Sequence, residues 1–131
     1  MKKEILNQMA RGEIENVLII DDEIDVCYLL TGILKQSNFL STCVNNLSDA
    51  EKALKKSHPS IIFLDNHLPD GLGVNFISKA KKIHPDTKII MITAHDTVED
   101  KKLAIDNGVD SFIGKPFTRN LVLSTLRELS I

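Results

Sequence analysis

Four short apolar runs of the chain each end in a residue that can bind a cation, act as a nucleophile or hold an anion. These residues are Asp21 with Asp22, Asp65, Thr93 and Lys115. If the fold brings the three carboxylates together, their charges raise one another's pKa unless positive charge intervenes. Carboxylate oxygens suit Mg²⁺, which keeps coordination positions open for a phosphoryl oxygen. Phosphoryl transfer requires a nucleophile, a metal and fixed donors for the phosphoryl oxygens, so this set of residues predicts that chemistry.

Asp65 is the natural nucleophile of the set, because a carboxylate can accept a phosphoryl group covalently. Thr93 and Lys115 would then hold the phosphoryl oxygens and complete the catalytic group. Each residue also has an ordinary interpretation. Asp65 could be a turn residue at the end of a strand, Asp21 and Asp22 could favour the start of a helix, and Thr93 could be a β-branched strand residue.

Five short apolar runs predict the strands that position these residues. The runs are Val17–Ile20, Leu40–Val44, Ile61–Leu64, Ile89–Ile92 and Ser111–Ile113. The first, third and fourth are continuous and rich in Val and Ile, as is typical of strands buried on both faces. With the fourth counted from residue 88, their starts are 21–27 residues apart, which is the length of a strand, a helix and two loops.

The segments between the runs are predicted to be helices. An apolar stripe marks the helix over 23–36, and its members are Val26, Leu29, Leu30, Ile33 and Leu34. Ser48 with Glu51 predicts a capping box at the start of the second helix. The fourth helix, about 97–107, has a poor apolar pattern, and Asn107 with Gly108 predicts its end.

Alternating strands and helices predict an α/β fold with a parallel sheet. We expect a flavodoxin-like (βα)5 three-layer sandwich whose five-stranded sheet has the order 2-1-3-4-5. In that order ligands bind outside the carboxyl ends of the strands, near the first and third strands.

These residues together resemble a known family. The motifs are Val17–Asp22, then Asp65–Pro69 with Gly73, then Thr93–Ala94, then Lys115–Pro116. In this order, and at the ends of the right strands, they resemble the CheY-like receiver domains of bacterial two-component response regulators. The resemblance covers residues 16–130, and the segment 86–117 looks most like receivers attached to nitrogen-regulator-type transcription activators.

The resemblance implies a role for each site residue. Asp65 looks like the phosphoacceptor, and a Mg²⁺ ion would be held by Asp22 directly, by Asp21 mostly through water, by Asp65 and by the main-chain carbonyl of His67. Thr93 and Phe112 look like the switch residues. Lys115 would pair with the acyl phosphate, and Pro116 would follow a cis peptide bond.

Two histidines and one aromatic residue have open interpretations. His67 and His95 each lie two residues past a site residue, and they could either modulate dephosphorylation or be exposed loop residues without a role. Phe112 could belong to the core as well as to the switch. The poorly patterned fourth helix suggests a small free-energy gap between two placements of that helix.

Composition excludes several classes of protein. The formal net charge of -2 argues against binding nucleic acid directly through bulk charge. No apolar run approaches the roughly 18 residues of a membrane span, and no signal peptide is evident. Cys27 and Cys43 form no metal or redox motif, so we expect separate buried thiols in a reducing, cytoplasmic setting.

We expect a receiver domain over 16–131, after an N-terminal extension of residues 1–15. In that extension Ile5, Leu6 and Met9 could make one helical turn, or the segment could be a frayed tail. Because the sequence stops where the fifth helix should end, the effector is expected to be another protein or a further domain.

The expected function is a signalling switch that takes a phosphoryl group from a histidine kinase or a histidine phosphotransfer protein. It would alter the surface of its fourth helix, fifth strand and fifth helix to control an output protein or domain, with a phosphorylation-linked homodimer as a further expectation. Three alternatives are a phosphorylation-independent scaffold, a phosphatase resembling haloacid dehalogenases, and a cofactor carrier resembling flavodoxin. The phosphatase would need an aspartate where His67 stands, and the carrier would need a phosphate loop where Asp21, Asp22 and Glu23 stand.

Overall fold

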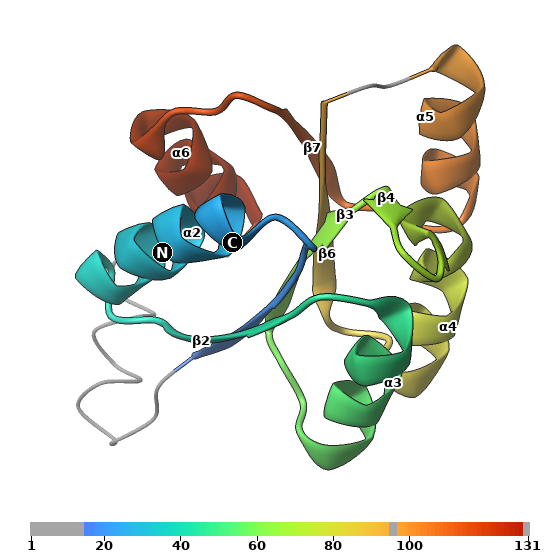
Figure 1. The fold of residues 1–131 in the computed structure, drawn as a ribbon, viewed down its shortest axis with the longest axis horizontal. Helices are drawn as coiled ribbons and strands as arrows, with labels where there is room; N and C mark the ends of the chain where they lie inside the picture. Colours follow the sequence, from blue (N-terminus) through green and yellow to red (C-terminus); the bar gives the residue numbers. More distant parts are fainter. Residues whose placement is uncertain (1–14, 95–96, 130–131) are drawn as a thin grey trace.

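The computed structural model describes residues 15–94 and 97–129, which form one five-stranded parallel sheet with helices on both faces (Figure 1). The strands of this sheet are β1 (Asn16–Ile20), β2 (Leu40–Val44), β3 (Ile61–Asp65), β6 (Lys88–Thr93) and β7 (Ser111–Gly114). Their order is β2-β1-β3-β6-β7, and every pair is parallel. The predicted order 2-1-3-4-5 is therefore confirmed, and each predicted strand is present to within one residue at either end.

The helices divide between the two faces of the sheet. They are α2 (Ile24–Gln36), α3 (Leu47–Lys56), α4 (Ile77–Ile83), α5 (Val98–Asp106) and α6 (Arg119–Leu129). Figure 1 shows α2 and α6 on one side of the sheet and α3, α4 and α5 on the other. Two apolar clusters fill the space between sheet and helices, one on each face, so the fold has three layers.

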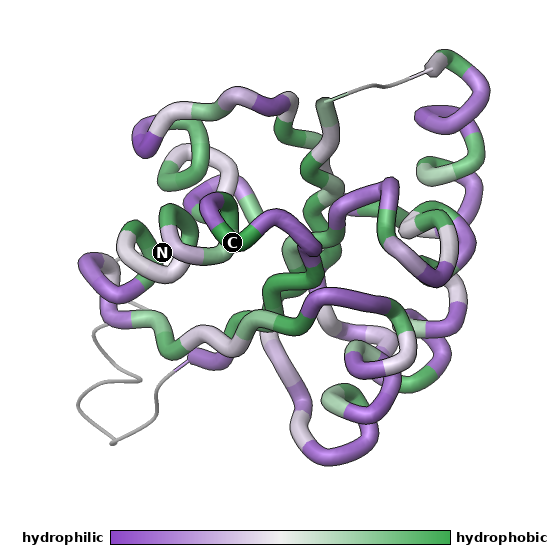
Figure 2. The backbone as a smooth tube through the Cα atoms, viewed as in Figure 1, coloured by the Kyte–Doolittle hydropathy of each residue, from purple (hydrophilic) through white to green (hydrophobic). Residues whose placement is uncertain are grey.

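The hydrophobic residues concentrate on the strands. In Figure 2 the central strands are the most continuously hydrophobic part of the tube, and hydrophilic residues dominate the outer turns of the helices. All five residues of β3 are buried, as are four of the five in β1. Alternate side chains of a strand point to opposite faces, so a strand that is buried on both faces is apolar along most of its length, and in β3 the one polar residue is Asp65 at its carboxyl end.

Two local expectations about the first two helices are wrong. Leu29 of the predicted apolar stripe is 48% exposed, and only Leu30, Ile33 and Leu34 of the stripe are buried. The predicted Ser48–Glu51 capping box does not form at the start of α3. Instead the side chain of Asn46 accepts a hydrogen bond from Asp49 N at 2.7 Å.

The cap of α3 is completed from a distant loop. Both carboxylate oxygens of Asp70 accept hydrogen bonds from the first backbone N–H groups of the helix, at 2.8 Å from Leu47 and 3.0 Å from Ser48. Glu51 is thereby left free to pair with Lys55 and Lys79. The correction has a physical reason, because a tertiary contact satisfies the N–H groups that the local capping box would have served.

A small hairpin follows the third strand and was not predicted. Its strands are β4 (His67–Leu68) and β5 (Gly71–Leu72), and a short 3-10 helix, η1 (Gly73–Asn75), leads into α4. At Gly73 a Cβ atom would lie 2.2 Å from the main-chain oxygen of Asp65. Only glycine fits there, which explains the place of this residue in the motif.

The helix α5 is the least anchored of the five. Among its residues only Ala104 is buried, whereas Val98 is 80% exposed and Ile105 is 62% exposed. The helix ends at Asp106 with Asn107 as its C-cap, and Gly108 follows with φ of 101°, as the sequence predicts. The weak apolar pattern of the predicted helix is thus matched by weak burial.

Several expectations fall outside the described residues. They concern the extension over residues 1–14, the loop histidine His95, and the end of the chain at Ser130 and Ile131. Within the described part of the chain, no helix combines the length and the apolar character that crossing a membrane requires.

Candidate functional site

The sheet register brings three carboxylates together at the carboxyl ends of β1 and β3. Ile20 pairs with Leu64 across these strands, so Asp21 and Asp65, the next residue of each strand, end at the same level. Asp22 completes the group, and one carboxylate oxygen of each residue lies within 4.8 Å of the others. Asp21 is 0% exposed and Asp65 is 4% exposed, while Asp22 is open to solvent. The expected meeting of the three acids is thus observed.

Lys115 reaches this group from the end of β7. Its Nζ lies 2.9 Å from Asp21 Oδ2, 3.1 Å from Glu23 Oε1 and 3.6 Å from Asp65 Oδ1. The ammonium group of Lys115 is therefore shared among three acids, and its contact with Asp65 is the longest of the three.

Burial and charge move the pKa values of this group. Burial first, and then the charge of Asp21, raise the pKa of Asp65 to about 6, although Lys115 opposes the shift. Burial acts to lower the pKa of Lys115, but its close contact with Asp21 and the other nearby negative charges outweigh burial and raise the pKa. Near neutral pH Asp65 is thus ionised, but at a cost in free energy.

The site has the donor chemistry of a divalent-cation site. Asp21 Oδ2 is buried, has an ion-pair contact with Lys115, and has no hydrogen-bond partner. A buried carboxylate oxygen without hydrogen bonds is costly, and a cation beside it would offset that cost. Three hard oxygen donors, one of them on a solvent-exposed side chain, fit an ion that retains some of its waters.

Thr93 and Phe112 lie on neighbouring strands beside the acids. Thr93 ends β6, is 4% exposed and pairs with Gly114, and its main-chain oxygen accepts a hydrogen bond from Lys115 N at 2.9 Å. Phe112 in β7 is half-buried and packs against the cluster under α3, α4 and α5. The Nζ of Lys101 lies 5.8 Å from the centre of its ring. The expected cis peptide bond between Lys115 and Pro116 is present.

The two residues that follow Asp65, Asn66 and His67, differ in burial and in hydrogen bonding. The side chain of His67 is exposed at the start of β4. The side chain of Asn66 is buried and donates to Asp100 Oδ2 at 3.2 Å, and its Oδ1 accepts from Val74 N at 3.1 Å. Asn66 was not among the site residues predicted from the sequence, although an amide directly between Asp65 and His67 was a visible signal.

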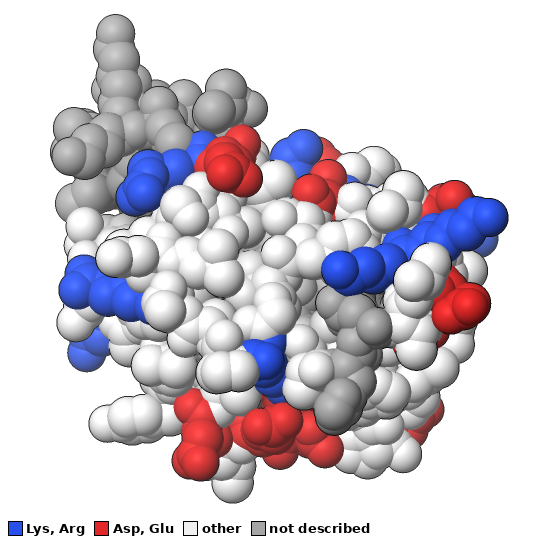
Figure 3. Space-filling model, turned by 90° about the horizontal axis from the view of Figure 1, so that it is seen from above, with Lys and Arg blue, Asp and Glu red and all other residues white. Residues whose placement is uncertain are grey.

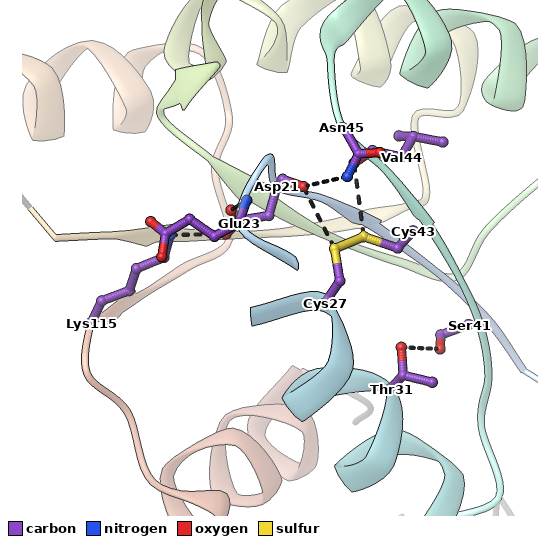
Figure 4. The surroundings of a disulfide bond; sticks show 9 residues. All are labelled: Asp21, Glu23, Cys27, Thr31, Ser41, Cys43, Val44, Asn45 and Lys115. Carbon is purple, nitrogen blue, oxygen red and sulfur yellow. Dashed lines mark hydrogen bonds and ion pairs between the residues drawn. A yellow bond between two sulfur atoms is a disulfide. The ribbon is translucent and has the colours of Figure 1, made fainter. Parts of the chain in front are cut away.

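The two cysteines are joined, which corrects the expectation of separate buried thiols. Cys27 in α2 and Cys43 in β2 form a disulfide with a Cα–Cα distance of 6.1 Å, and both residues are half-buried (Figure 4). Figure 4 shows the sulfur atoms beside the main chain of Asp21, whose carbonyl also accepts a hydrogen bond from Asn45 Nδ2 at 3.1 Å. Sequence spacing alone could not reveal this pair, because it depends on how α2 packs against the edge strand.

The charged side chains of one face can be followed in Figure 3. A row of Asp and Glu side chains lies along the lower border of this view, with a basic side chain directly beside it, and other Lys and Arg side chains lie toward the left and right borders. The described residues form no continuous basic patch on this face. That distribution agrees with the net charge of -2.

A family model for the response regulator receiver domain matches residues 17–127. Among curated proteins, the chain is 30% identical to the probable transcriptional regulatory protein TcrX of Mycobacterium tuberculosis, over 92% of this chain and 51% of TcrX. It is 32% identical to the nitrogen assimilation regulatory protein NtrX of Azorhizobium caulinodans, over 87% of this chain and 26% of NtrX. The chain thus spans about half or a quarter of the length of these relatives.

Solved structures agree in fold. A CheY-like receiver domain protein from Methanospirillum hungatei superposes with a TM-score of 0.87 at 24% identity, covering 90% of this chain and 95% of that one. The beryllofluoride-activated NtrC4 receiver domain dimer superposes with a TM-score of 0.82 at 36% identity, covering 87% of this chain and 94% of that one.

Proposed function

Because the chain belongs to the response regulator receiver domain family, we propose that it acts as a phosphorylation-dependent switch whose phosphoacceptor is Asp65. The observation that carries this proposal is the meeting of Asp21, Asp22, Asp65 and Lys115 at one edge of the sheet. The receiver domain occupies 16–131, and residues 1–15 are an extension before it.

The transfer to Asp65 is a displacement at phosphorus. The donor is a phosphohistidine on a histidine kinase or a histidine phosphotransfer protein. An Asp65 carboxylate oxygen forms a bond to phosphorus while the phosphorus–nitrogen bond breaks, and the electron pair leaves on the imidazole nitrogen of the donor, which can then take up a proton. With a pKa of about 6, Asp65 is ionised for this attack at neutral pH.

The acidic group would hold Mg²⁺ through Asp21, Asp22, Asp65 and the main-chain carbonyl of His67. When bound, the ion supplies positive charge that offsets the charge of the phosphoryl oxygens and of the clustered acids. Lys115 would pair with a phosphoryl oxygen, because it already contacts Asp65 at 3.6 Å and its ammonium is largely withdrawn from solvent. Thr93 would donate its hydroxyl to another phosphoryl oxygen.

The response would reach the surface through Thr93 and Phe112. Movement of Thr93 toward the phosphoryl group opens space that the ring of Phe112 can enter, and α5 can shift because it is weakly buried. The surface formed by α5, β7 and α6 would then present a different face to an output protein or domain. Accepting one phosphoryl group and assisting its hydrolysis does not make the protein a turnover enzyme.

The partners follow from this role. We infer a cytoplasmic kinase or phosphotransfer protein upstream, and no direct contact with nucleic acid or membrane by this domain. The NtrC4 receiver is described as a dimer in its beryllofluoride-activated form, and a phosphorylation-linked homodimer of this chain is the corresponding proposal.

Intact mass after incubation with acetyl phosphate and Mg²⁺ tests the proposal. We expect a single phosphoryl adduct on the wild-type chain and none on Asp65→Asn, while the exposed loop variant Asp70→Asn is modified like the wild type. No adduct with any donor would favour the phosphorylation-independent scaffold. Continued release of phosphate from small esters would favour the aspartyl phosphatase.

A further inference from the structure

Asn66 connects the acceptor carboxylate with a distant helix through two different groups. Its backbone N–H directly follows Asp65 and acts to lower the pKa of that carboxyl group. Its side-chain amide donates to Asp100 Oδ2 at 3.2 Å, in the first turn of α5. The residue is 1% exposed, so this bond does not have to compete with bulk water at Asn66.

A second asparagine holds the other end of the same helix. Asn107, the C-cap of α5, donates its side-chain amide to the main-chain oxygen of Val74 at 2.9 Å. The N–H of Val74 donates to Asn66 Oδ1 at 3.1 Å. The two asparagines therefore bind the N–H and the carbonyl of one residue, and between them they connect both ends of α5 to the segment that follows Asp65.

Polar contacts matter more for α5 than for the other helices. Only Ala104 of α5 is buried among its residues, so apolar burial does little to select one position of the helix. A hydrogen bond to a carboxylate is stronger than one between neutral groups. The bond between Asn66 and Asp100 can thus decide between two placements of α5 that differ little in apolar burial.

We propose that Asn66 is a positioning residue that transmits the state of Asp65 to α5. The bond from Asn66 to Asp100 holds α5 in the placement described above. Phosphorylation converts the Asp65 carboxylate into an acyl phosphate, which changes the charge and bulk directly beside Asn66, and the side chain of Asn66 then releases Asp100. This inference rests on the proposed function, because it assumes that Asp65 is the acceptor.

Linkage gives the direction of the expected effect. If the bond stabilises the unphosphorylated placement, its removal raises the population of the other placement and hence the affinity for a phosphoryl mimic. One hydrogen bond with a typical net contribution of about 1 kcal/mol changes such an equilibrium by about fivefold.

The experiment measures beryllofluoride affinity in Mg²⁺ by titration of the α5 amide signals in NMR spectra. Asp100→Ala is expected to bind about fivefold more tightly than the wild type. Asp100→Asn keeps an acceptor oxygen and should stay within about twofold of the wild type. Glu99→Ala is the matched control, because Glu99 is exposed, lies on the same helical turn and loses the same charge.

A second pair of variants tests the hydrogen bond between residues 66 and 100 without the Asp100→Ala substitution. Asn66→Asp places two carboxylates face to face, and adding Asp100→Asn restores a donor and an acceptor in reversed order. The double variant Asn66→Asp/Asp100→Asn should bind beryllofluoride about fivefold more weakly than Asn66→Asp/Glu99→Gln, which has the same charge and the same residue at position 66.

The outcomes separate the two proposals. If the wild type binds beryllofluoride and Asp100→Ala matches Glu99→Ala, or binds more weakly, the role of Asn66 is refuted and the function of Asp65 stands. If the wild type neither binds beryllofluoride nor forms the phosphoryl adduct, the proposed function is refuted and this inference is refuted with it.

Discussion

Lys115 divides its charge among acids that the fold crowds together. Its shortest contact is with Asp21 at 2.9 Å, and its contact with Asp65 is longer, at 3.6 Å. Asp65 is therefore only partly compensated, and burial keeps its pKa high. At the scale of single residues, the charged side chains of the site therefore reduce the free energy of unfolding of the protein when no cation is bound.

The pKa of Asp65 predicts how stability depends on pH. The folded-state pKa is raised from 3.8 to about 6, so between these values the folded protein holds a proton that the unfolded chain has lost. The free energy of unfolding must then decrease as pH rises through this range, by up to about 3 kcal/mol. In chelator, we expect Asp65→Asn to remove this decrease and to be the more stable protein at pH 7.5.

Urea unfolding of both proteins at pH 5 and pH 7.5 measures this difference. Asp106→Asn, an exposed acid in α5, is the control and should follow the wild type. An Asp65→Asn variant that is less stable than the wild type at pH 7.5 in chelator would contradict the assigned cost of the buried charge.

At the scale of elements, contacts between segments far apart in the sequence cap a helix and tie a helix to a strand. The start of α3 is capped by Asp70 from the turn between β4 and β5, which also holds that hairpin against the helix. The disulfide ties α2 to β2 on the other face of the sheet. Both contacts join segments that no periodic pattern relates.

Removing the Asp70 carboxylate should destabilise α3. The hydrogen bond from Leu47 N lowers the pKa of Asp70 although desolvation opposes the shift, and the bond from Ser48 N contributes further. Because the folded pKa is depressed, this stabilisation is present near neutral pH and is lost as pH falls through the folded pKa. We expect Asp70→Ala to lower the melting temperature by a few degrees at pH 7, with a smaller effect in acid, while Asp106→Ala changes it little.

The disulfide predicts a redox dependence of stability. It closes a loop of 16 residues in sequence separation, and a loop of that size corresponds to about 3 kcal/mol of stabilisation in the chain-entropy model. Reductant should lower the free energy of unfolding of the wild type by up to that amount. The free energy of unfolding of the double variant Cys27→Ala/Cys43→Ala should be the same with and without reductant. A wild type whose free energy of unfolding does not change with reductant would contradict the prediction.

At the scale of the whole molecule, the two apolar layers hold the sheet rigid while its carboxyl edge carries the uncompensated charge. The strands β1 and β3 are buried almost throughout, so the acids at their carboxyl ends cannot move apart to reduce their repulsion. Binding of a cation to the folded state alone should therefore stabilise the entire fold.

Mg²⁺ should raise the free energy of unfolding by about 2.7 kcal/mol when its concentration is one hundred times its dissociation constant. Asp22→Asn should reduce this gain, because it removes the solvent-exposed ligand without disturbing buried packing. Thermal unfolding with Mg²⁺ and with chelator measures the effect. Equal gains for the wild type and Asp22→Asn would show that the ion binds elsewhere.

The sequence alone determined the sheet and the acids, lysine and hydroxyl at its edge. Short apolar runs rich in Val and Ile that recur at the spacing of a strand and a helix indicate buried strands. Parallel strands place their carboxyl ends at one edge of the sheet, so Asp21, Asp65, Thr93 and Lys115 were expected to converge. Each of these steps depends on local pattern and on the general geometry of parallel sheets, and neither requires knowledge of the loops.

Only the tertiary structure decided which polar side chains connect the loops. Asn66 binds Asp100 across 34 residues of sequence, and Asp70 binds Leu47 across 23. Such contacts depend on the path of a loop and on which N–H groups remain unpaired after the helices pack, and no residue spacing encodes either. The same reason explains why the sequence located Cys27 and Cys43 in their elements but not their bond.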